Sequence, residues 1–395
     1  MLVLEYLFWL ALATVVYTYV GYAVVVGLLA ALVRRLRPPR PLLPFEPAVT
    51  LVVPAYNEAR ILAAKVENCL AQDYPTELLQ LVVITDGSTD NSAQVLARYP
   101  RVRHLHSPVR GGKSLAENRA MEFVHTPFVV FTDANTDLNP RAVRELVQHY
   151  QNPQVGAVSG EKKVRPLAGS TPGAGEGLYW KYESFLKRCD SCVYSLMGAA
   201  GELVSFRSHL FRPLEADTIL DDFVQSLRLV EQGYTVVYEP RAYATEDPSP
   251  TLADEWERKI RICAGGWQAM GRLRALLNPV RRPLATFLYV SHRVLRWSAA
   301  PVALALLLPL SAVLAATASS GRAGFYGLAT AAQVLFYLAA WRGWQGASGK
   351  LTVVPLYFCL MNLAVFAGFR RYYRKAQPAA WAKAARPQEP QLAAE

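Results

Sequence analysis

Cysteine and histidine are scarce in this chain, with five and six copies among 395 residues. The cysteines are scattered along the sequence, at Cys69, Cys189, Cys192, Cys263 and Cys359. Cys189 and Cys192 have the spacing of half a zinc or redox site, but no second pair and no suitable histidine cluster accompanies them. We therefore interpret all five as incidental reduced thiols, which fits a domain in the cytosol.

The long apolar run at the start of the chain lacks the marks of a cleaved signal peptide. No basic region precedes Leu2–Val33, and no small-residue cleavage site follows it. Glu5 is its only charged residue, and about 20 apolar residues are enough to cross a bilayer. We expect a retained anchor here. Three more apolar runs follow near the C-terminus, at Ser298–Thr317, Ala323–Trp341 and Leu351–Phe369.

The net charge of +11 comes without any nucleic-acid-binding motif, which argues against nucleic acid as a partner. The basic residues flank the apolar runs instead. Arg34, Arg35, Arg37 and Arg40 follow the first run, Arg272, Arg274, Arg281, Arg282, Arg293 and Arg296 precede the second, and Arg370, Arg371, Arg374 and Lys375 follow the last. Such clusters attract anionic headgroups and mark the cytoplasmic side. The sequence predicts a multi-pass protein of the inner (plasma) membrane, partnered by the lipid bilayer, with its soluble domain in the cytoplasm.

The last apolar run conflicts with this topology. Three full crossings after the soluble domain would place the basic cluster 370–375 outside, against the positive-inside rule. Leu351–Phe369 also contains Pro355 and Asn362. We expect this run to lie at the interface or to re-enter the membrane.

The composition divides the chain into six parts. They are a membrane anchor (1–36), a proline-rich linker (37–47), a soluble domain (48–271), interfacial amphipathic helices (272–297), a C-terminal membrane region (298–375) and a cytosolic, disordered tail (376–395). The prolines of the linker exclude a regular helix. There is no internal repeat.

Short apolar runs alternate with amphipathic segments in the soluble domain. The expected strands are Val49–Pro54, Leu79–Ile84, Val102–His106, Phe128–Thr132, Val155–Val164 and Val236–Tyr238. The expected helices are Glu58–Gln72, Asn91–Tyr99, Lys113–Val124, 140–151, Leu178–Lys187, Asp221–Gln232 with Gly233 as its C-cap, Trp256–Met270 and Arg272–Leu277, and Gly169–Gly177 is expected to be a loop. This alternation predicts an α/β domain with a Rossmann-like, mostly parallel sheet. Ligands bind beyond the carboxyl ends of such strands.

Two turns at those strand ends carry candidate binding residues. VPAYNEA contains Pro54, Tyr56, Asn57 and Glu58, of which the last two could instead cap the following helix. TDGSTDNS places Asp86 at a strand end, where its carboxylate can accept hydrogen bonds from a base or ribose. Plain turn chemistry, with Asp90 capping the next helix, is the alternative.

Two further motifs suit a metal-bound diphosphate. Gly111-Gly112-Lys113 precedes a helix N-terminus, where backbone amides and a lysine can hold phosphate, although a solvated lysine fits equally well. FTDANTD places Asp133 and Asn135 two residues apart on a turn, so both oxygens can face one Mg²⁺ or Mn²⁺ ion. A simple Asx turn is the alternative.

The segment DDF opens a helix with two carboxylates, Asp221 and Asp222. We expect one of them to cap the helix. Neighbouring helical residues point in different directions, so the other can face the cleft as a general base. The central expectation is spatial: Asp86, Asp133 and Asp222 should meet in one pocket.

In order and spacing, PAYNEA, TDGSTDNS, GGKSLAENRA, TDANT, GAAGELVSFR and DDFVQSLRLVEQGY resemble the motifs of membrane-bound family-2 glycosyltransferases. The resemblance covers about residues 48–267, and the flanking runs are similar to those of enzymes related to cellulose, hyaluronan and poly-N-acetylglucosamine synthases. It implies a GT-A fold, a nucleoside-diphosphate sugar donor, a divalent metal and inversion at the anomeric carbon.

The resemblance also implies roles for individual residues. Pro54, Tyr56, Glu58 and Asp86 would bind the nucleotide, Lys113 and Arg261 the diphosphate, Asp133 and Asn135 the metal, and Gly198, Gly201, Asp221 and Trp267 the acceptor, with Asp222 as catalytic base. One departure concerns the Gln-x-x-Arg-Trp motif of polymerising members. The aligned segment here reads Arg258-Lys-Ile-Arg261-Ile262, and Trp267 comes six residues after Arg261.

The sequence thus predicts a metal-dependent, inverting transferase that moves a sugar from a nucleotide donor, UDP-linked in our expectation, to a glycan or lipid-linked acceptor. Two alternatives stay open. One is a single-sugar transferase onto polyprenyl phosphate, and the other is a non-catalytic membrane subunit that binds nucleotide-sugar.

Overall fold

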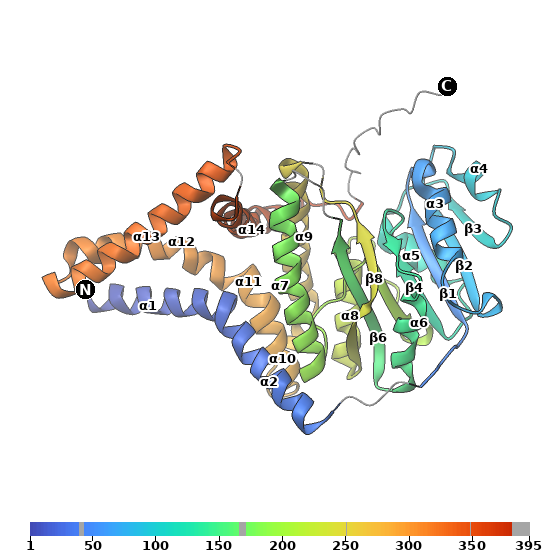
Figure 1. The fold of residues 1–395 in the computed structure, drawn as a ribbon, viewed down its shortest axis with the longest axis horizontal. Helices are drawn as coiled ribbons and strands as arrows, with labels where there is room; N and C mark the ends of the chain where they lie inside the picture. The colour runs from blue at the N-terminus through green and yellow to red at the C-terminus, as the bar shows by residue number, and fades with distance from the viewer. Residues whose placement is uncertain (39–42, 166–170, 250, 348, 381–395) are drawn as a thin grey trace.

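The computed structural model describes residues 1–38, 43–165, 171–249, 251–347 and 349–380. The described residues contain one mixed, eight-stranded sheet, from which the apolar helices extend to one side (Figure 1). The strands are β1 (Val49–Ala55), β2 (Leu79–Asp86), β3 (Val102–Ser107), β4 (Phe128–Thr132), β5 (Asp137–Leu138), β6 (Val155–Val164), β7 (Leu203–Arg207) and β8 (Thr235–Glu246), in the spatial order β3-β2-β1-β4-β7-β6-β8-β5.

The sheet confirms the α/β prediction. One unexpected strand, β7, is antiparallel. β1 pairs in parallel with β2 and β4, β2 with β3, and β6 with β8. β7 runs antiparallel between β4 and β6, and the sequence analysis did not predict it. The carboxyl ends of β1, β2 and β4 therefore lie at one rim of the sheet, as expected.

Helices cover both faces of the sheet because its central strands are apolar on both sides. On β1, Leu51 and Val53 face the cluster that contains Leu62 of α3 (Ala59–Leu70), whereas Val52 faces the cluster that contains Ala116 of α5 (Lys113–Met121). Each fully buried valine or leucine contributes about 1.5–3 kcal/mol. Apolar packing from both sides thus fixes the strand ends that carry the candidate site.

The remaining helices are α4 (Ser92–Leu96), α6 (Ala142–Val147), α7 (Thr171–Val193), α8 (Asp221–Gln232), α9 (Leu252–Arg272), α10 (Pro283–Tyr289) and α11 (Leu295–Trp297). Short 3₁₀ turns lie at Thr76–Leu78, Gln148–Gln151, Ser208–Leu210 and Arg274–Leu277. Gly233 ends α8 in the left-handed conformation, with a φ of 98°, which confirms the predicted C-cap.

The prediction of a loop over Gly169–Gly177 is wrong for the residues that the structure describes. Helix α7 begins at Thr171 and continues for 23 residues. Pro172 is compatible with this start because the first turn of a helix needs no donor from it. Residues 169 and 170, part of the linker and the tail beyond residue 380 lie outside the described residues.

Four described helices are long and apolar enough to cross a membrane, and they coincide with the four predicted runs: Leu2–Leu36, Ala299–Thr317, Gly321–Trp344 and Lys350–Tyr373. In the first, α1 (Leu2–Val16) and α2 (Tyr22–Leu36) meet at a π-helical turn over Tyr17–Gly21. The chain bends there, so that α1 lies beside α12 (Ala299–Thr317) while α2 turns toward α7 (Figure 1). Bends of this kind are frequent at π turns.

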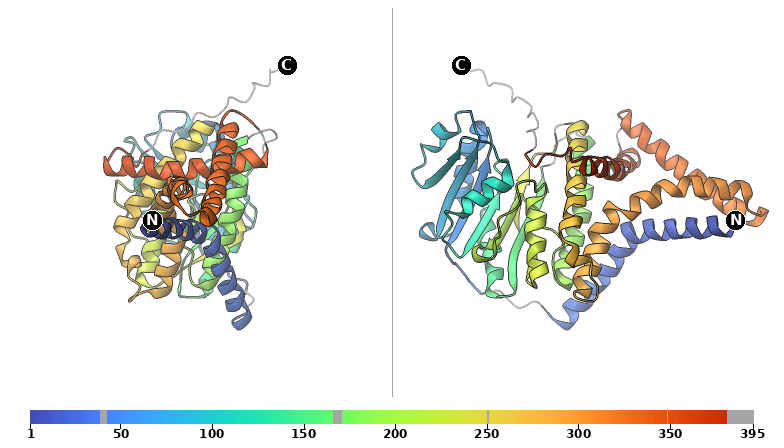
Figure 2. Two further views of the ribbon diagram at one scale, coloured as in Figure 1. Left: turned by 90° about the vertical axis from the view of Figure 1, so that its left-hand side faces the viewer. Right: turned by 180° about the vertical axis from the view of Figure 1, so that it is seen from behind.

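The last apolar run forms α14 (Lys350–Tyr373), after α13 (Ser320–Trp344). Viewed from the side, α14 lies across the direction shared by α1 and α12 (Figure 2). Pro355 and Asn362 of this helix are both buried. An interfacial placement of this helix stays a prediction that its direction supports.

Candidate active site

The loops after β1 and β2 are tied together by side chains. Asn57 takes a left-handed backbone conformation, with a φ of 53°. Its side-chain oxygen accepts from Thr89 N at 2.8 Å, and its own N–H donates to Ser88 Oγ at 3.0 Å. Asp90 accepts from Ala59 N at 2.9 Å, so it caps α3. The residue that caps α3 is therefore in the neighbouring loop, not Asn57 or Glu58.

Asp86 organises the glycine loop that precedes α5. Its carboxylate accepts from Gly111 N at 3.0 Å and from Gly112 N at 2.6 Å, and it forms an ion pair with Arg119. Gly112 needs its φ of 89°, which disfavours other residues. Only 4% of Asp86 is exposed. These contacts fix the loop that positions Lys113. The contact of Asp86 with a base or ribose stays a prediction.

Lys113 is the centre of the site. Its Nζ lies 2.6 Å from Asp133 Oδ1, 3.5 Å from Asp221 Oδ2 and 3.9 Å from Glu117 Oε1, and it donates to Gly201 O at 3.4 Å. Burial lowers the pKa of Lys113, but the four surrounding carboxylates, Asp133, Asp221, Glu117 and Asp222, outweigh it and hold the pKa well above its usual value. The ammonium is therefore charged, and its ion pairs with Asp133 and Asp221 argue against the interpretation of Lys113 as a solvated surface charge.

Asp222 stands beside this cluster. A Cβ added to Gly201 would lie 2.9 Å from Lys113 Nζ and 3.3 Å from Asp222 Oδ2, so all three meet at one point. Burial, and then the neighbouring Asp221 carboxylate, raise the pKa of Asp222 to about 7, while Lys113 lowers it. A carboxylate with that pKa is suited to accept a proton near neutral pH.

The predicted cap at the start of α8 is wrong. The N-cap position is Leu220, which has no polar side chain, and both Asp221 and Asp222 lie in the first turn. The helix dipole still favours their charge there. Gly198, at a φ of 101°, leaves room for Phe223, whose ring would lie 2.2 Å from an added Cβ. Gly198 therefore shapes the protein behind Asp222, whereas Gly201 lines the site itself.

The turn that carries Asp133 is supported from behind by a buried lysine. Lys65 Nζ donates to Thr132 Oγ1 at 3.0 Å and to Thr136 O at 2.6 Å. Asn135 is exposed on the same turn, and the Asp133 side chain is 28% exposed. No group of three or more His, Cys, Asp or Glu side chains among the described residues could hold a metal on its own. One carboxylate with a neighbouring amide fits an ion that is completed by substrate phosphates.

Of two further predicted residues on α9, Arg261 lies at the site and Trp267 packs against another helix. Arg261 of α9 interacts electrostatically with Asp221, Asp222 and Asp133, which places it at the site. Trp267 packs elsewhere, because the centre of its ring lies 4.8 Å from that of Phe369 in α14. A role for Trp267 in acceptor binding has no support from this packing.

Three nucleotide-binding candidates lie at the end of β1 or between β1 and α3. The Tyr56 ring is covered by the guanidinium of Arg110 at 3.8 Å. Pro54 lies beyond Val52, the last β1 residue that pairs with β4, where a missing N–H is tolerated. Glu58 immediately precedes α3 and is partly buried.

Sequence reasoning missed three residues of the site. Glu117 lies one helical turn after Lys113, and burial followed by the Asp221 charge raises its pKa well above the usual value. Arg119 holds Asp86. Glu202 accepts from the buried Lys162 at 2.7 Å, directly beside Gly201. The spacing of four between Lys113 and Glu117 was a signal that could have revealed the first of them.

Comparisons with known proteins identify the family of this chain. The model of "Glycosyl transferase family 2" matches residues 50–199, and that of "Glycosyl transferase family group 2" matches residues 128–367. Poly-β-1,6-N-acetyl-D-glucosamine synthases of Staphylococcus epidermidis and of Staphylococcus aureus strain COL are each 23% identical over 231 residues, which is 57% of this chain and 56% of the synthases. The match thus spans little more than half the length of these relatives.

One solved structure is similar over nearly the whole chain. The mannosyltransferase PcManGT from Pyrobaculum calidifontis, in complex with GDP-Man and Mn²⁺, has a TM-score of 0.68 at 24% identity and covers 93% of this chain and 99% of its own. At this identity the likeness concerns the fold, and it confirms the predicted GT-A architecture. Since a family model matches more than half of the chain, the protein belongs to the family-2 glycosyltransferases and is a relative of the poly-N-acetylglucosamine synthases.

Proposed function

We propose that this enzyme transfers a sugar from a UDP-linked donor to a hydroxyl group of a glycan or lipid-linked acceptor, with inversion at the anomeric carbon and with Mg²⁺ or Mn²⁺ as cofactor. The reaction takes place at the cytoplasmic face of the inner membrane. The observation that carries the proposal is one cluster, in which Lys113 contacts Asp133 and Asp221 beside Asp222.

Asp133 and Asn135 are the residues that would hold the metal. A bound divalent cation would neutralise negative charge on the departing diphosphate. Lys113 and Arg261 add fixed positive charge at the same place, which stabilises the charge that develops as the donor bond breaks.

Asp222 is the proposed general base. With a pKa of about 7, it can take the proton of an acceptor hydroxyl as that oxygen attacks the anomeric carbon. Attack in a single step, on the face opposite the departing diphosphate, inverts the configuration. Gly201 provides the open space next to the carboxylate, because any side chain there would contact both Asp222 and Lys113.

Donor and metal are tested together. Purified enzyme in lipid would be incubated with radiolabelled UDP-N-acetylglucosamine or GDP-mannose, the latter being the donor bound in the solved mannosyltransferase. Each donor is tested with Mn²⁺, with Mg²⁺ and with EDTA, and the product is sized. We expect UDP-sugar consumption that EDTA abolishes. Consumption of GDP-mannose alone would refute the UDP donor, and binding without turnover of any donor would favour the non-catalytic alternative.

A further inference from the structure

The ring of Phe223, which directly follows the proposed base, is surrounded by side chains of one helical segment, 283–297. The centre of the ring lies 6.4 Å from that of Tyr289 and 5.3 Å from that of Trp297. The guanidinium carbon of Arg293 lies 5.8 Å from the same ring centre. These three residues are spaced four positions apart, and a π turn interrupts the segment between the outer two. Turns of this kind are frequent at functional sites.

Arg293 makes two polar contacts beside this ring. Its Nε donates to Met197 O at 2.7 Å, and its Nη2 forms an ion pair with Glu183 Oε1, also at 2.7 Å. The Arg293 side chain is 11% exposed. Hydrogen bonds from a charged donor are short and strong, and the planar guanidinium fixes the directions of both contacts. Arg293 therefore joins three elements, which are the loop before β7, α7 and, through Phe223, α8.

The backbone of the loop 197–201, which precedes β7, is tied down by three side chains. Each comes from a different element: Arg293 donates to Met197 O, Ser226 Oγ of α8 accepts from Ala199 N at 3.0 Å, and Ser159 Oγ of β6 accepts from Ala200 N at 3.2 Å. Gly201 ends the loop, and a Cβ added to it would lie 3.3 Å from Asp222 Oδ2. The three ties therefore set the position of Gly201 relative to the proposed base.

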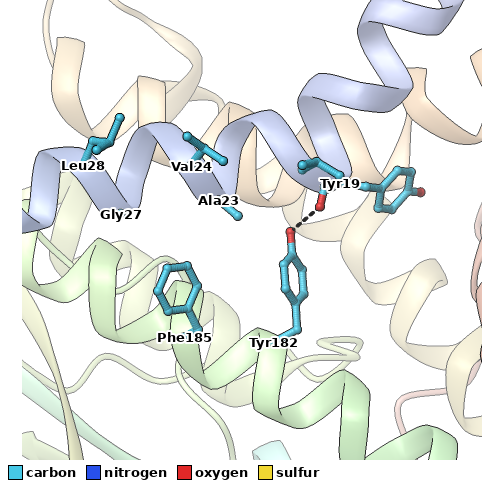
Figure 3. A pocket seen from close by; sticks show the side chains of 8 residues that line it. Tyr19, Ala23, Val24, Gly27, Leu28, Tyr182 and Phe185 are labelled. Carbon is cyan, nitrogen blue, oxygen red and sulfur yellow. Dashed lines mark hydrogen bonds between the residues drawn. The ribbon is translucent and has the colours of Figure 1, made fainter.

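The carboxylate partner of Arg293 is held by α7, which packs against the first apolar helix. Figure 3 shows the Tyr182 hydroxyl donating to Tyr19 O at 2.8 Å across that contact. Glu183, the next residue on α7, also pairs with Arg296 at 3.2 Å. The guanidinium carbon of Arg296, however, lies 5.2 Å from the centre of the Tyr182 ring. Two arginines thus share one carboxylate, and Arg293 is the one that reaches the loop.

We propose that Arg293 is a positioning residue for the glycosyl transfer. It holds both the loop 197–201 and the Phe223 ring. Since Gly201 ends that loop and Asp222 precedes that ring, Arg293 fixes the space beside the base. A displacement of reacting groups by about 1 Å can cost about 10²-fold in rate. The segment that carries Arg293 leads directly into α12, so the geometry of the base depends on the chain that enters the apolar helices. This inference rests on the proposed function, because it concerns the base of that reaction.

The test compares two arginines of the same segment. Arg293→Met and Arg296→Met each remove a guanidinium that is 11% or 12% exposed and that pairs with Glu183. The first change also removes the contacts with Met197 and Phe223. Purified full-length protein in lipid is assayed with radiolabelled UDP-N-acetylglucosamine, or with GDP-mannose if the wild-type enzyme uses that donor. The measurements are kcat, the dissociation constant of the donor and the melting temperature.

We expect Arg293→Met to lower kcat by about tenfold or more, while the dissociation constant of the donor stays within about twofold. Arg296→Met should keep kcat within about twofold of the wild type. Both variants remove a partner of Glu183 and should lower the melting temperature alike. A merely structural role of Arg293 would therefore change kcat in both variants to the same extent.

Unchanged kcat in Arg293→Met, or an equal loss in Arg296→Met, would overturn the positioning role. If Arg293→Met does not fold, Ser226→Ala decides, because it releases Ala199 N of the same loop without altering any charge. It should lower kcat by about threefold or more, and an unchanged kcat would contradict the proposal. Wild-type transfer tests the proposed function on its own. Its absence would refute that function and the inference with it, whereas normal wild-type transfer confines a negative result to Arg293.

Discussion

The ammonium of Lys113 lies 2.6 Å from Oδ1 of Asp133, which joins the start of α5 to the turn after β4. A positive charge therefore already stands beside the carboxylate that we propose as a metal ligand. Lys113 has Asp221 as a second partner at 3.5 Å, so it can release Asp133 and remain paired. Under the proposed function, a metal ion could replace the ammonium at Asp133 without leaving Lys113 unpaired.

The first prediction concerns the charge of Lys113. Lys113 lowers the pKa of Asp222, so Lys113→Met should move the midpoint of the pH–rate profile upward by about one unit or more. The exposed Lys163→Met is the control and should leave the midpoint in place. An unshifted midpoint in Lys113→Met would show that the two groups are not coupled.

The wild-type enzyme should lose activity in acid. Asp222 must be deprotonated to act as a base, and its pKa is raised to about 7, so it is protonated below that pH. The rate of transfer should fall about tenfold for each unit below the pKa and reach a plateau above it. Steady-state rates from pH 5 to 9 test this, and a flat profile through pH 6 would exclude Asp222 as the titrating base.

Removal of the proposed metal ligand should weaken metal binding. Asp133→Ala should lower the affinity for Mn²⁺ in the presence of UDP by about tenfold or more, because the site offers few other protein ligands. Electron paramagnetic resonance measures free Mn²⁺ directly, without any turnover. Asp137→Ala, on an exposed position of the same segment, should bind normally. Equal Mn²⁺ binding by both variants would remove Asp133 from the metal site.

Gly201 should tolerate no side chain. The Cβ of Gly201→Ala would lie 2.9 Å from Lys113 Nζ and 3.3 Å from Asp222 Oδ2. We expect kcat to fall by about tenfold or more, since small displacements of reacting groups are costly, while the melting temperature changes little. Gly324→Ala, which meets nothing within 4 Å, serves as the control. Normal turnover by Gly201→Ala would mean that the acceptor binds elsewhere.

The sequence predicted the elements with strong local signals. Phe128–Thr132 and Val155–Val164 were placed with the observed bounds. The first was clear because an apolar run ends there in a polar turn. Four apolar runs were equally clear. The meeting of Asp133 and Asp222 at one cluster also followed from the sequence, since β4 ends at the predicted rim and α8 begins beside it.

The features that were not predicted depend on tertiary contacts, which leave no local pattern in the sequence. β7 is a five-residue strand whose antiparallel pairing with β4 and β6 decides its conformation. Asp86 was placed correctly at the end of β2, but its contacts with the backbone of Gly111 and Gly112 were not foreseen, because that loop folds back onto it from a distance in the sequence. Arg296 was expected at the lipid headgroups, yet it is buried against Glu183. In each case a residue distant in sequence determines the outcome.

The most direct test of the account separates chemistry from donor binding in a single variant. Asp222→Asn keeps the size of the side chain and removes its capacity to take a proton. Transfer should fall by about 10²–10⁴-fold, while the dissociation constant for the nucleotide-sugar stays within about twofold. Asp217→Asn, on a side chain that is 74% exposed, should behave as the wild type. Full transfer activity of Asp222→Asn would contradict the assignment of Asp222 as the base and, with it, the proposed mechanism.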